Sequence, residues 1–148
     1  MPRARPVAGL ARVSAPRPVP VPTDDRPVHP GLFTDRGLIG TQCGTCGRRN
    51  FPAARPCPWC ASDDVSDVEL SSEGTLWGWT AVTAAPPGYD GPVPYGFGVV
   101  SLPADGLQVV TRLVEADPAA LQEGDAMRFT VVALSDGVVT WAFTRARR

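Results

Sequence analysis

The four cysteines of the chain form two Cys-x2-Cys pairs with ten residues between them, at Cys43, Cys46, Cys57 and Cys60. Each pair fits a tight turn that directs two thiolates at one point. Two such turns give the tetrahedral four-sulfur arrangement that Zn²⁺ favours. The spacer, residues 47–56, is long enough for a short hairpin that brings the second turn onto the first. We therefore predict one structural zinc ion per chain, held by all four sulfurs.

Other uses of the cysteines stay open at this stage. Two disulfides would need an oxidising compartment, and the N-terminus has no apolar run of the roughly 7–15 residues that a secretory signal contains. A redox Cys-x-x-Cys usually stands alone in a βαβ context. An iron centre of the rubredoxin type also uses two Cys-x-x-Cys turns. Glycine directly after a pair lets backbone N–H groups face the sulfurs; Gly47 follows the first pair, but Ala61 follows the second.

Composition divides the chain into three predicted parts. Residues 1–30 hold eight of the seventeen prolines, which fix φ and remove backbone donors, so we predict a disordered or polyproline II-like tail that includes the single histidine, His29. Residues 31–64 are the predicted zinc ribbon, and residues 65–148 the predicted second domain. A ribbon this small has little core of its own. We expect its apolar residues Leu38, Ile39 and Phe51 to cover the metal.

Charge is distributed unevenly although the formal net charge is only −1. Residues 1–30 and 31–60 each carry +3, and residues 61–148 carry −7, with arginine as the only basic residue type. No apolar segment approaches the ~20 residues that a membrane helix needs. We expect a cytoplasmic protein without membrane contact.

Short alternating strands separated by Gly, Pro and Asp turns follow residue 65. Five strands are predicted, at residues 75–84, 94–102, 107–114, 126–134 and 138–143. The second and third form a hairpin. A single helical turn is predicted before the fourth, with Asp117 as its N-cap and Pro118 at its first position. This order predicts a mostly β chain in which a rubredoxin-like zinc ribbon precedes a small, five-stranded OB-fold barrel.

Aromatic side chains of the predicted barrel are candidate stacking platforms for single-stranded nucleic acid. They are Trp77, Trp79, Tyr95, Phe97, Phe129, Trp141 and Phe143. Strict alternation in the first strand places Leu76 on one face and both Trp77 and Trp79 on the other. Phosphate neutralisation supplies most non-specific affinity, and residues 61–148, which contain the predicted barrel, carry a charge of −7. We therefore expect most of these aromatics to be core, and keep nucleic-acid binding as the alternative function.

Catalytic motifs are missing from the sequence. It contains no Ser/His/Cys triad, no glycine-rich phosphate loop and no credible carboxylate pair. Four sulfurs would also saturate a zinc ion and leave no position for an activated water. We expect a chain that is not itself an enzyme.

Several motifs in sequence order carry a resemblance to a known family. They include Cys43-Gly-Thr-Cys46-Gly, Arg55-Pro-Cys57-Pro-Trp-Cys60, Gly74-Thr-Leu-Trp-Gly-Trp-Thr80 and Val93-Pro-Tyr-Gly-Phe-Gly-Val-Val100. Over roughly residues 36–145 the chain resembles the DUF35 family, zinc-ribbon plus OB-fold proteins that accompany thiolase-like acyl-CoA enzymes. The resemblance implies a non-catalytic accessory subunit of a hetero-oligomer. Such a subunit binds a thiolase, a lipid-transfer-type thiolase or aldolase, or a related condensing enzyme, and stabilises it or helps form its CoA channel.

Four further residues are candidates for contact with CoA or with the partner. Arg48, Arg49 and Arg55 lie on the predicted ribbon, where a planar guanidinium can clamp CoA phosphates or partner carboxylates. An alternative explains the three arginines equally well: they keep the ribbon soluble and offset the negative charge of a zinc–thiolate centre. Tyr89 is at the tip of the proline-rich loop 84–93, a predicted partner surface because a rigid loop loses little entropy on binding.

Overall fold

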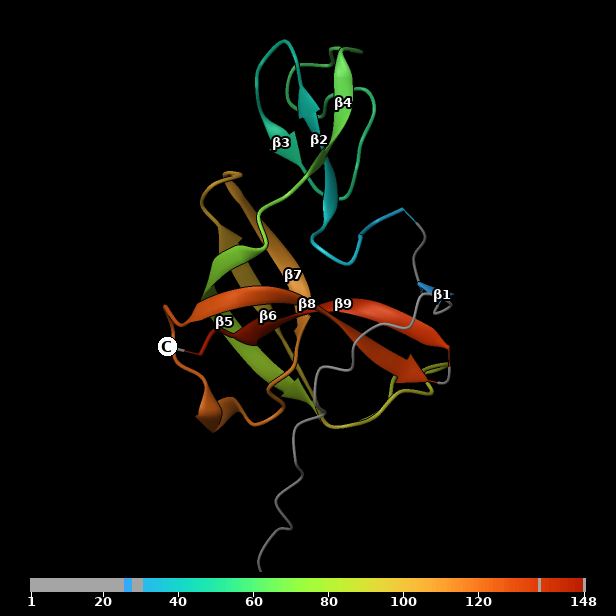
Figure 1. Cartoon of the computed structure of the whole chain (residues 1–148), viewed down its shortest axis with the longest axis vertical. Helices are drawn as coiled ribbons and strands as arrows, with labels where there is room; N and C mark the ends of the chain where they lie inside the picture. Colours follow the sequence, from blue (N-terminus) through green and yellow to red (C-terminus); the bar gives the residue numbers. More distant parts are fainter. Residues whose placement is uncertain (1–25, 28–30, 136, 148) are drawn as a thin grey trace, which may run out of the picture.

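A computed structural model describes residues 26–27, 31–135 and 137–147 of the chain. It has a three-stranded sheet at one end of a β-barrel, as Figure 1 shows, and this confirms the predicted ribbon-plus-barrel class. Most of the predicted tail, including His29, lies outside the described residues. No helix in the described part of the chain has the length and apolar character needed to cross a membrane.

The ribbon consists of β2 (Ile39–Cys43), β3 (Arg49–Asn50) and β4 (Val65–Glu69) in the order β3-β2-β4. Both pairings are antiparallel, and the β2–β4 register runs from Ile39 opposite Glu69 to Cys43 opposite Val65. Strand β2 leads away from the barrel and ends at the first cysteine (Figure 1). The cysteines therefore lie at the end of the ribbon remote from the barrel.

The barrel is built from the five predicted strands. They are β5 (Glu73–Val82), β6 (Tyr95–Leu102), β7 (Leu107–Leu113), β8 (Ala126–Ser135) and β9 (Val138–Arg145). Strand β5 pairs with β6 and β8, β6 with β7, and β8 with β9. A parallel pairing of Leu113 with Phe143 closes the barrel between β7 and β9.

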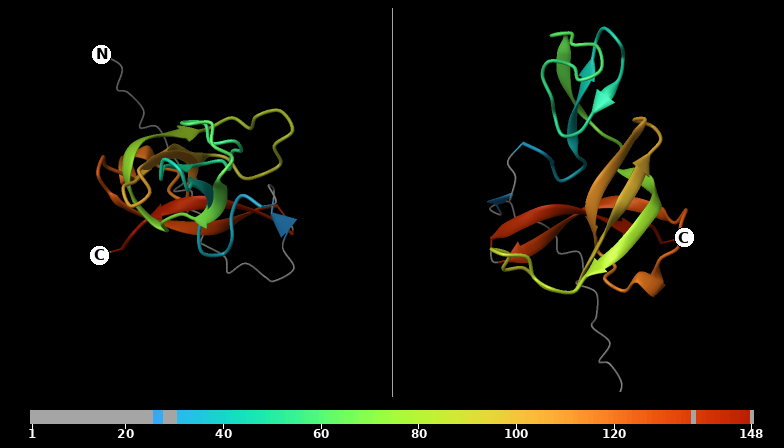
Figure 2. Two further views of the ribbon diagram at one scale, coloured as in Figure 1. Left: turned by 90° about the horizontal axis from the view of Figure 1, so that it is seen from above. Right: turned by 180° about the vertical axis from the view of Figure 1, so that it is seen from behind.

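The predicted helical turn is the 3-10 helix η1 (Pro118–Ala120), which lies at the end of the barrel opposite the ribbon (Figure 2). Its cap is the predicted one, because the Asp117 carboxylate accepts a hydrogen bond from the Ala119 N–H at 2.9 Å. A two-residue strand, β1 (Arg26–Pro27), pairs in parallel with β9 at the edge of the sheet. Proline is compatible with an edge strand, although it is excluded from a central one.

One apolar core joins the ribbon to the barrel. Leu38 and Leu70, which flank the ribbon, are buried in the same cluster as the barrel interior. Phe51 meets Trp141 of β9 edge-on at a centroid distance of 6.1 Å, and Phe33 meets the same indole at 5.6 Å. The expectation that Leu38 and Phe51 cover the metal is therefore wrong. Leu38 is about 17 Å from Cys43 along an extended strand, so it reaches the barrel instead.

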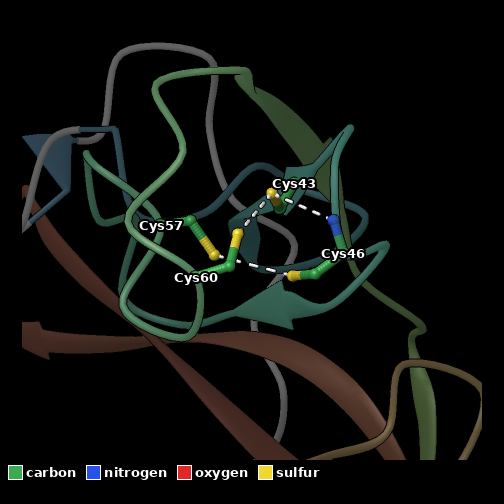
Figure 3. A group of neighbouring side chains, drawn as sticks. All are labelled: Cys43, Cys46, Cys57 and Cys60. Atoms are coloured by element: carbon green, nitrogen blue, oxygen red, sulfur yellow. Dashed lines mark hydrogen bonds between the residues drawn. The ribbon is translucent and has the colours of Figure 1, made fainter.

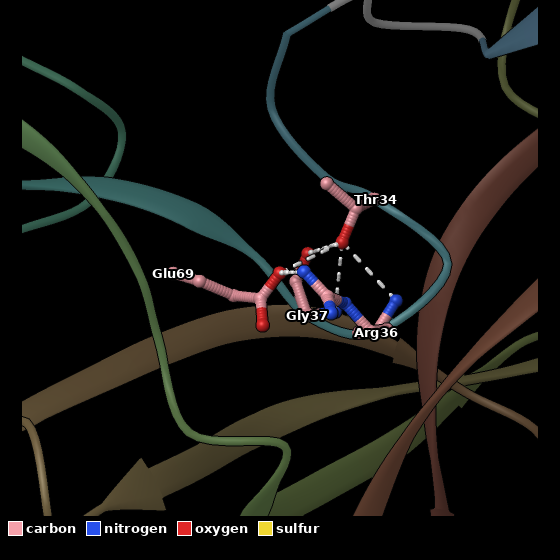
Figure 4. A network of polar contacts seen from close by, with 4 residues as sticks. All are labelled: Thr34, Arg36, Gly37 and Glu69. Atoms are coloured by element: carbon pink, nitrogen blue, oxygen red, sulfur yellow. Dashed lines mark hydrogen bonds and ion pairs between the residues drawn. The ribbon is translucent and has the colours of Figure 1, made fainter.

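A polar turn holds the segment before β2 against the end of β4 (Figure 4). The Thr34 hydroxyl accepts hydrogen bonds from the backbone N–H groups of Arg36 and Gly37, at 3.1 and 3.3 Å. It donates to the Glu69 carboxylate at 3.2 Å, and the Arg36 guanidinium donates to the same oxygen at 3.3 Å. This network fixes the ribbon where it meets the barrel.

Strand β5 contains a bulge that changes which of its side chains face inward. Leu76 pairs with Val100 and Gly78 with Val99, so Trp77 is an extra residue in the ladder. Leu76 is buried, Trp77 is 59% exposed, and Trp79 packs against the core and donates from Nε1 to the Pro118 carbonyl at 2.9 Å. The predicted strict alternation is wrong because a bulge shifts the inward phase by one residue.

The aromatic residues divide between the core and the surface. Phe129 and Phe143 are buried and meet edge-on at 5.9 Å. Trp79 and Trp141 pack against the same core, as expected. The expectation that most of the seven are core is therefore confirmed, and the exceptions are Trp77, Phe97, which is 40% exposed, and Tyr95, whose outer side carries an arginine.

Candidate metal centre

Two turns of the same backbone geometry carry the cysteines. The Gly47 N–H donates to the Cys43 carbonyl at 2.9 Å, and the Ala61 N–H donates to the Cys57 carbonyl at 2.9 Å. Gly47 has φ +73° and Ala61 has φ +57°. Ala61 thus takes the left-handed conformation that favours glycine, at a cost of roughly 1 kcal/mol. The absence of glycine after the second pair does not change the turn.

The four thiols converge on one point between these turns (Figure 3). Their sulfur atoms all lie within 4.8 Å of one another, with 3.6 Å between Cys43 and Cys60 and 3.7 Å between Cys46 and Cys57. A zinc ion with Zn–S bonds of about 2.3 Å needs tetrahedral edges of about 3.8 Å. The spacing fits that ion. All four cysteines are free, so the structure contains neither of the two disulfides considered above.

The electrostatics of the thiols are those of a site that loads a cation. The backbone N–H of Cys46, which donates to the Cys43 sulfur at 3.5 Å, is the main cause that lowers the pKa of Cys43 to about 6. At Cys60 the Ser62 backbone N–H acts in the same direction, but burial and the three neighbouring cysteines together raise its pKa to about 12. The Cys43 sulfur therefore ionises readily, whereas the Cys60 thiol loses its proton only when a cation compensates the negative charge of the thiolates.

The three candidate arginines have separate partners. The Arg49 guanidinium binds Asp105 at the tip of the β6–β7 hairpin, and the other oxygen of this carboxylate accepts from the Ser71 N–H at 2.7 Å. Arg55 binds Asp67 at 2.5 Å and remains within the ribbon. These two guanidinium groups are therefore already engaged.

Arg48 lies in a different setting. Its guanidinium carbon stands 4.9 Å from the ring centre of Trp59, an indole that is 57% exposed. Both residues line a groove of about 450 Å³ between the ribbon and the β6–β7 hairpin. The groove is lined by Gln42, Gly47, Arg48, Arg49, Trp59, Ala104, Asp105, Gly106 and Leu107. Arg48 is thus the candidate arginine that stacks on an open surface.

Tyr89 does not project from its loop. Its hydroxyl accepts from the Arg112 guanidinium at 2.6 Å and donates to the Pro92 carbonyl at 3.1 Å. Its ring lies 5.3 Å from that of Tyr95. The side chain is half-buried against the barrel wall, and its contact with a partner stays a prediction.

Asp105 and Trp59 were missed by the sequence analysis. Asp105 carries the signal of a turn residue before Gly106, and nothing in the sequence links it to an arginine 56 residues earlier. Trp59 did offer a signal, because an aromatic residue between two metal-ligand candidates in a tight turn has no core to face.

The fold and the four-sulfur centre define the class of protein: a zinc ribbon joined to an OB-fold barrel. A family model described as the ChsH2 rubredoxin-like zinc ribbon domain matches residues 34–66. A second, described as the ChsH2 C-terminal OB-fold domain, matches residues 67–132. The chain belongs to the DUF35 family, as its motifs indicated.

Two named relatives and one solved structure are similar to this chain over much of its length. A DUF35 domain-containing scaffold protein of Methanocaldococcus jannaschii is 25% identical over 72% of this chain and 78% of its own length. The benzoylsuccinyl-CoA thiolase subunit BbsA of Thauera aromatica is 31% identical over 67% of this chain and 66% of its own length. A solved structure described as Ltp2-ChsH2(DUF35) aldolase is 23% identical with a TM-score of 0.63, covering 75% of this chain and 86% of that chain. This last likeness supports the fold.

Proposed function

We propose that this chain is a non-catalytic, zinc-stabilised accessory subunit that binds and stabilises a thiolase-fold acyl-CoA enzyme. The observation that carries the proposal is the similarity to a thiolase subunit, BbsA, over 99 residues, together with the four converging sulfurs. A relative is also named a scaffold protein. Catalysis belongs to the partner in this proposal.

Zinc has an architectural role here. Cys43, Cys46, Cys57 and Cys60 hold one ion per chain, and because four protein ligands complete its tetrahedron, no position is left for a reacting water. The ion joins the two turns at the end of the ribbon remote from the shared core. Because the ligands come from turns with little packing of their own, metal binding supplies folding energy to this end of the ribbon.

The finer part of the proposal is that the ribbon helps form the partner's CoA channel. Arg48 is the arginine suited to this, because it stacks on exposed Trp59 beside the groove. Arg49 and Arg55 are ion-paired within the chain and are poor candidates for CoA phosphates. A planar guanidinium on an exposed indole matches an anionic phosphate near an adenine ring.

Co-purification from the native cell tests the proposed function. The chain carries a C-terminal affinity tag, and the recovered proteins are identified by mass spectrometry while zinc is quantified. We expect a thiolase-fold subunit in stoichiometric amount and one zinc ion per tagged chain. A tagged Cys46→Ser chain, which lacks one zinc ligand, is compared with it and should recover less zinc and less of the thiolase-fold subunit. Recovery of the tagged chain without any thiolase-fold protein would contradict the proposal.

A further inference from the structure

The tip of the β6–β7 hairpin reaches the ribbon and is anchored on the barrel side (Figure 2). The Asp105 N–H donates to the Leu102 carbonyl at 3.1 Å, and the Gly106 N–H donates to the Pro103 carbonyl at 3.3 Å. Leu102 is fully buried in the shared core. Asp105 therefore presents its side chain to the ribbon from a turn whose backbone is held by the barrel.

The Asp105 carboxylate contacts the chain beyond both edges of the ribbon sheet. One oxygen binds the guanidinium of Arg49 on β3, three residues after the zinc ligand Cys46. The other oxygen accepts the Ser71 N–H at 2.7 Å, two residues after the end of β4. Strands β3 and β4 are the two neighbours of β2 in the ribbon sheet. The metal site thus lies at one end of the ribbon, and this carboxylate at the other.

Burial makes the contact between Arg49 and Asp105 hard to give up. The Asp105 side chain has no exposed area, whereas each side chain in the other ion pairs of the described residues is at least 22% exposed. A buried carboxylate that loses its partner is strongly destabilising, because no water replaces the lost charge. The hairpin therefore determines where Arg49 lies.

Only a short segment separates this contact from the first cysteine turn. The Cys43 N–H donates to the Arg48 carbonyl at 3.0 Å, and the Gly47 N–H donates to the Cys43 carbonyl at 2.9 Å. Strand β3, which follows at once, has two residues and two pairing positions on β2. Strand pairing this short is marginal by itself. The position of residues 46–50 therefore depends on the metal before them and on Asp105 beside them.

We propose that Asp105 is a positioning residue for the zinc site. Through Arg49 it holds the first cysteine turn in the geometry that binds zinc, so zinc binding and the contact between Arg49 and Asp105 stabilise each other. Such coupling is reciprocal, and it acts here through residues 46–50, which are either docked on the hairpin or released from it. This inference rests on the zinc-binding part of the proposed function and does not depend on the partner.

The coupling extends to the groove between the ribbon and the hairpin. Arg48 and Trp59 line it from the ribbon, and Asp105 lines it from the hairpin. Arg48 lies between the zinc ligand Cys46 and the ion-paired Arg49, so the same two contacts determine where its backbone lies. Loss of either contact would release the ribbon wall of the groove from the hairpin wall.

A direct effect of charge on the zinc site predicts the opposite result. A zinc ion bound by four thiolates carries a net negative charge, which a nearby carboxylate disfavours. By its field alone, removal of the Asp105 charge should therefore increase zinc affinity. Removal of its hold on Arg49 should decrease zinc affinity. The sign of the change in Asp105→Asn separates the two explanations.

Chelator competition on the full chain measures the zinc Kd. We expect Asp105→Asn and Arg49→Gln each to raise this Kd about tenfold, and the double variant to raise it no further, because both changes break one contact. Val132→Ala is the matched control, since Val132 is buried in a separate apolar cluster of the barrel. It should lower the unfolding midpoint and change the zinc Kd less than about twofold.

Amide hydrogen exchange gives a second measurement of the same coupling. Without zinc, the Ser71 N–H, which binds Asp105, should exchange at least about fivefold faster than in the zinc-loaded chain. The Val100 N–H, inside β6, should exchange at the same rate in both forms. In Asp105→Asn the exchange of Ser71 should depend less on zinc.

The outcomes separate this inference from the function on which it rests. If the unsubstituted chain binds zinc and Asp105→Asn binds it equally or more tightly, the inference is overturned and the proposed function stands. An equal loss of zinc affinity in Val132→Ala would show that affinity follows overall stability, and would also overturn the inference. If the unsubstituted chain binds no zinc, the zinc-stabilised role fails with it. Should Asp105→Asn not fold, Arg49→Gln and the exchange of Ser71 in the unsubstituted chain decide.

Discussion

The Arg49 guanidinium on β3 binds the carboxylate of Asp105, 56 residues further along the chain, and this ion pair links the ribbon to the β6–β7 hairpin. The Asp105 side chain is fully buried, whereas the Arg49 side chain is 29% exposed. The second Asp105 oxygen accepts the Ser71 N–H in the connection between β4 and β5. One carboxylate therefore contacts the ribbon, the connection and the barrel.

Asp105→Asn should destabilise the chain. The amide keeps the size of the side chain but removes its charge, so a largely buried guanidinium loses its counter-ion, at a cost of about 2 kcal/mol. Urea unfolding of the zinc-loaded protein measures the change. Arg36→Gln breaks the exposed pair with Glu69, in which Arg36 is 75% exposed, and should cost less than about 1 kcal/mol. An equal loss of unfolding free energy in Asp105→Asn and Arg36→Gln would show that the Asp105 contact stabilises the chain no more than an exposed ion pair does.

The two cysteine turns predict opposite effects of exchanging glycine and alanine. Ala61→Gly relieves a left-handed conformation and should stabilise the ribbon by about 1 kcal/mol. Gly47→Ala introduces the same strain without a steric clash and should destabilise it by about 1 kcal/mol. Competition with a zinc chelator should report these as roughly fivefold changes in zinc affinity, in opposite directions. A shift in the same direction for both would contradict the shared geometry.

Zinc affinity should increase with pH. The pKa of Cys60 is raised to about 12, so at neutral pH its proton must leave when zinc binds, and apparent affinity rises at least about tenfold per pH unit. The pKa of Cys43 is lowered to about 6, so above pH 6 this sulfur is already ionised and adds nothing to the slope. Below pH 6 its proton must leave as well, so the slope steepens. Chelator competition at several pH values measures this, and a flat profile would be inconsistent with thiolate ligation.

Arg48→Gln should weaken use of the CoA thioester by the complex. Arg48 stacks on Trp59 beside the groove, so its loss should raise KM about tenfold with little change in kcat, as expected for removal of uniform binding. Arg55→Gln is the matched control, because Arg55 is paired with Asp67. An unchanged KM in Arg48→Gln, or an equal rise in both variants, would remove Arg48 from the CoA channel.

Local signals in the sequence predicted most of the architecture. Cysteine spacing identified the two turns, and the dipeptide Asp117-Pro118 located η1 and its cap, because each of these depends on neighbouring residues alone. The β6–β7 hairpin was located by the turn residues Asp105 and Gly106.

Features that depend on distant contacts were not predictable in the same way. The bulge at Trp77 arises from the pairing of β5 with β6, and periodicity cannot signal one inserted residue. Leu38 and Phe51 were assigned to the metal because the ribbon was considered alone, whereas the barrel supplies a much larger apolar surface. The engagement of Arg49 by Asp105 required the tertiary fold for the same reason.

Reconstituted turnover of the acyl-CoA thioester tests the central claim most directly. The rate is measured for the chain alone, the thiolase-fold subunit alone, the two together, and the subunit with chain from which zinc has been removed by a chelator. We predict no turnover by the chain alone, full activity and stability of the subunit only with the zinc-loaded chain, and loss of that support after chelation. Thioester turnover by the isolated chain, or full support by the zinc-free chain, would contradict the account.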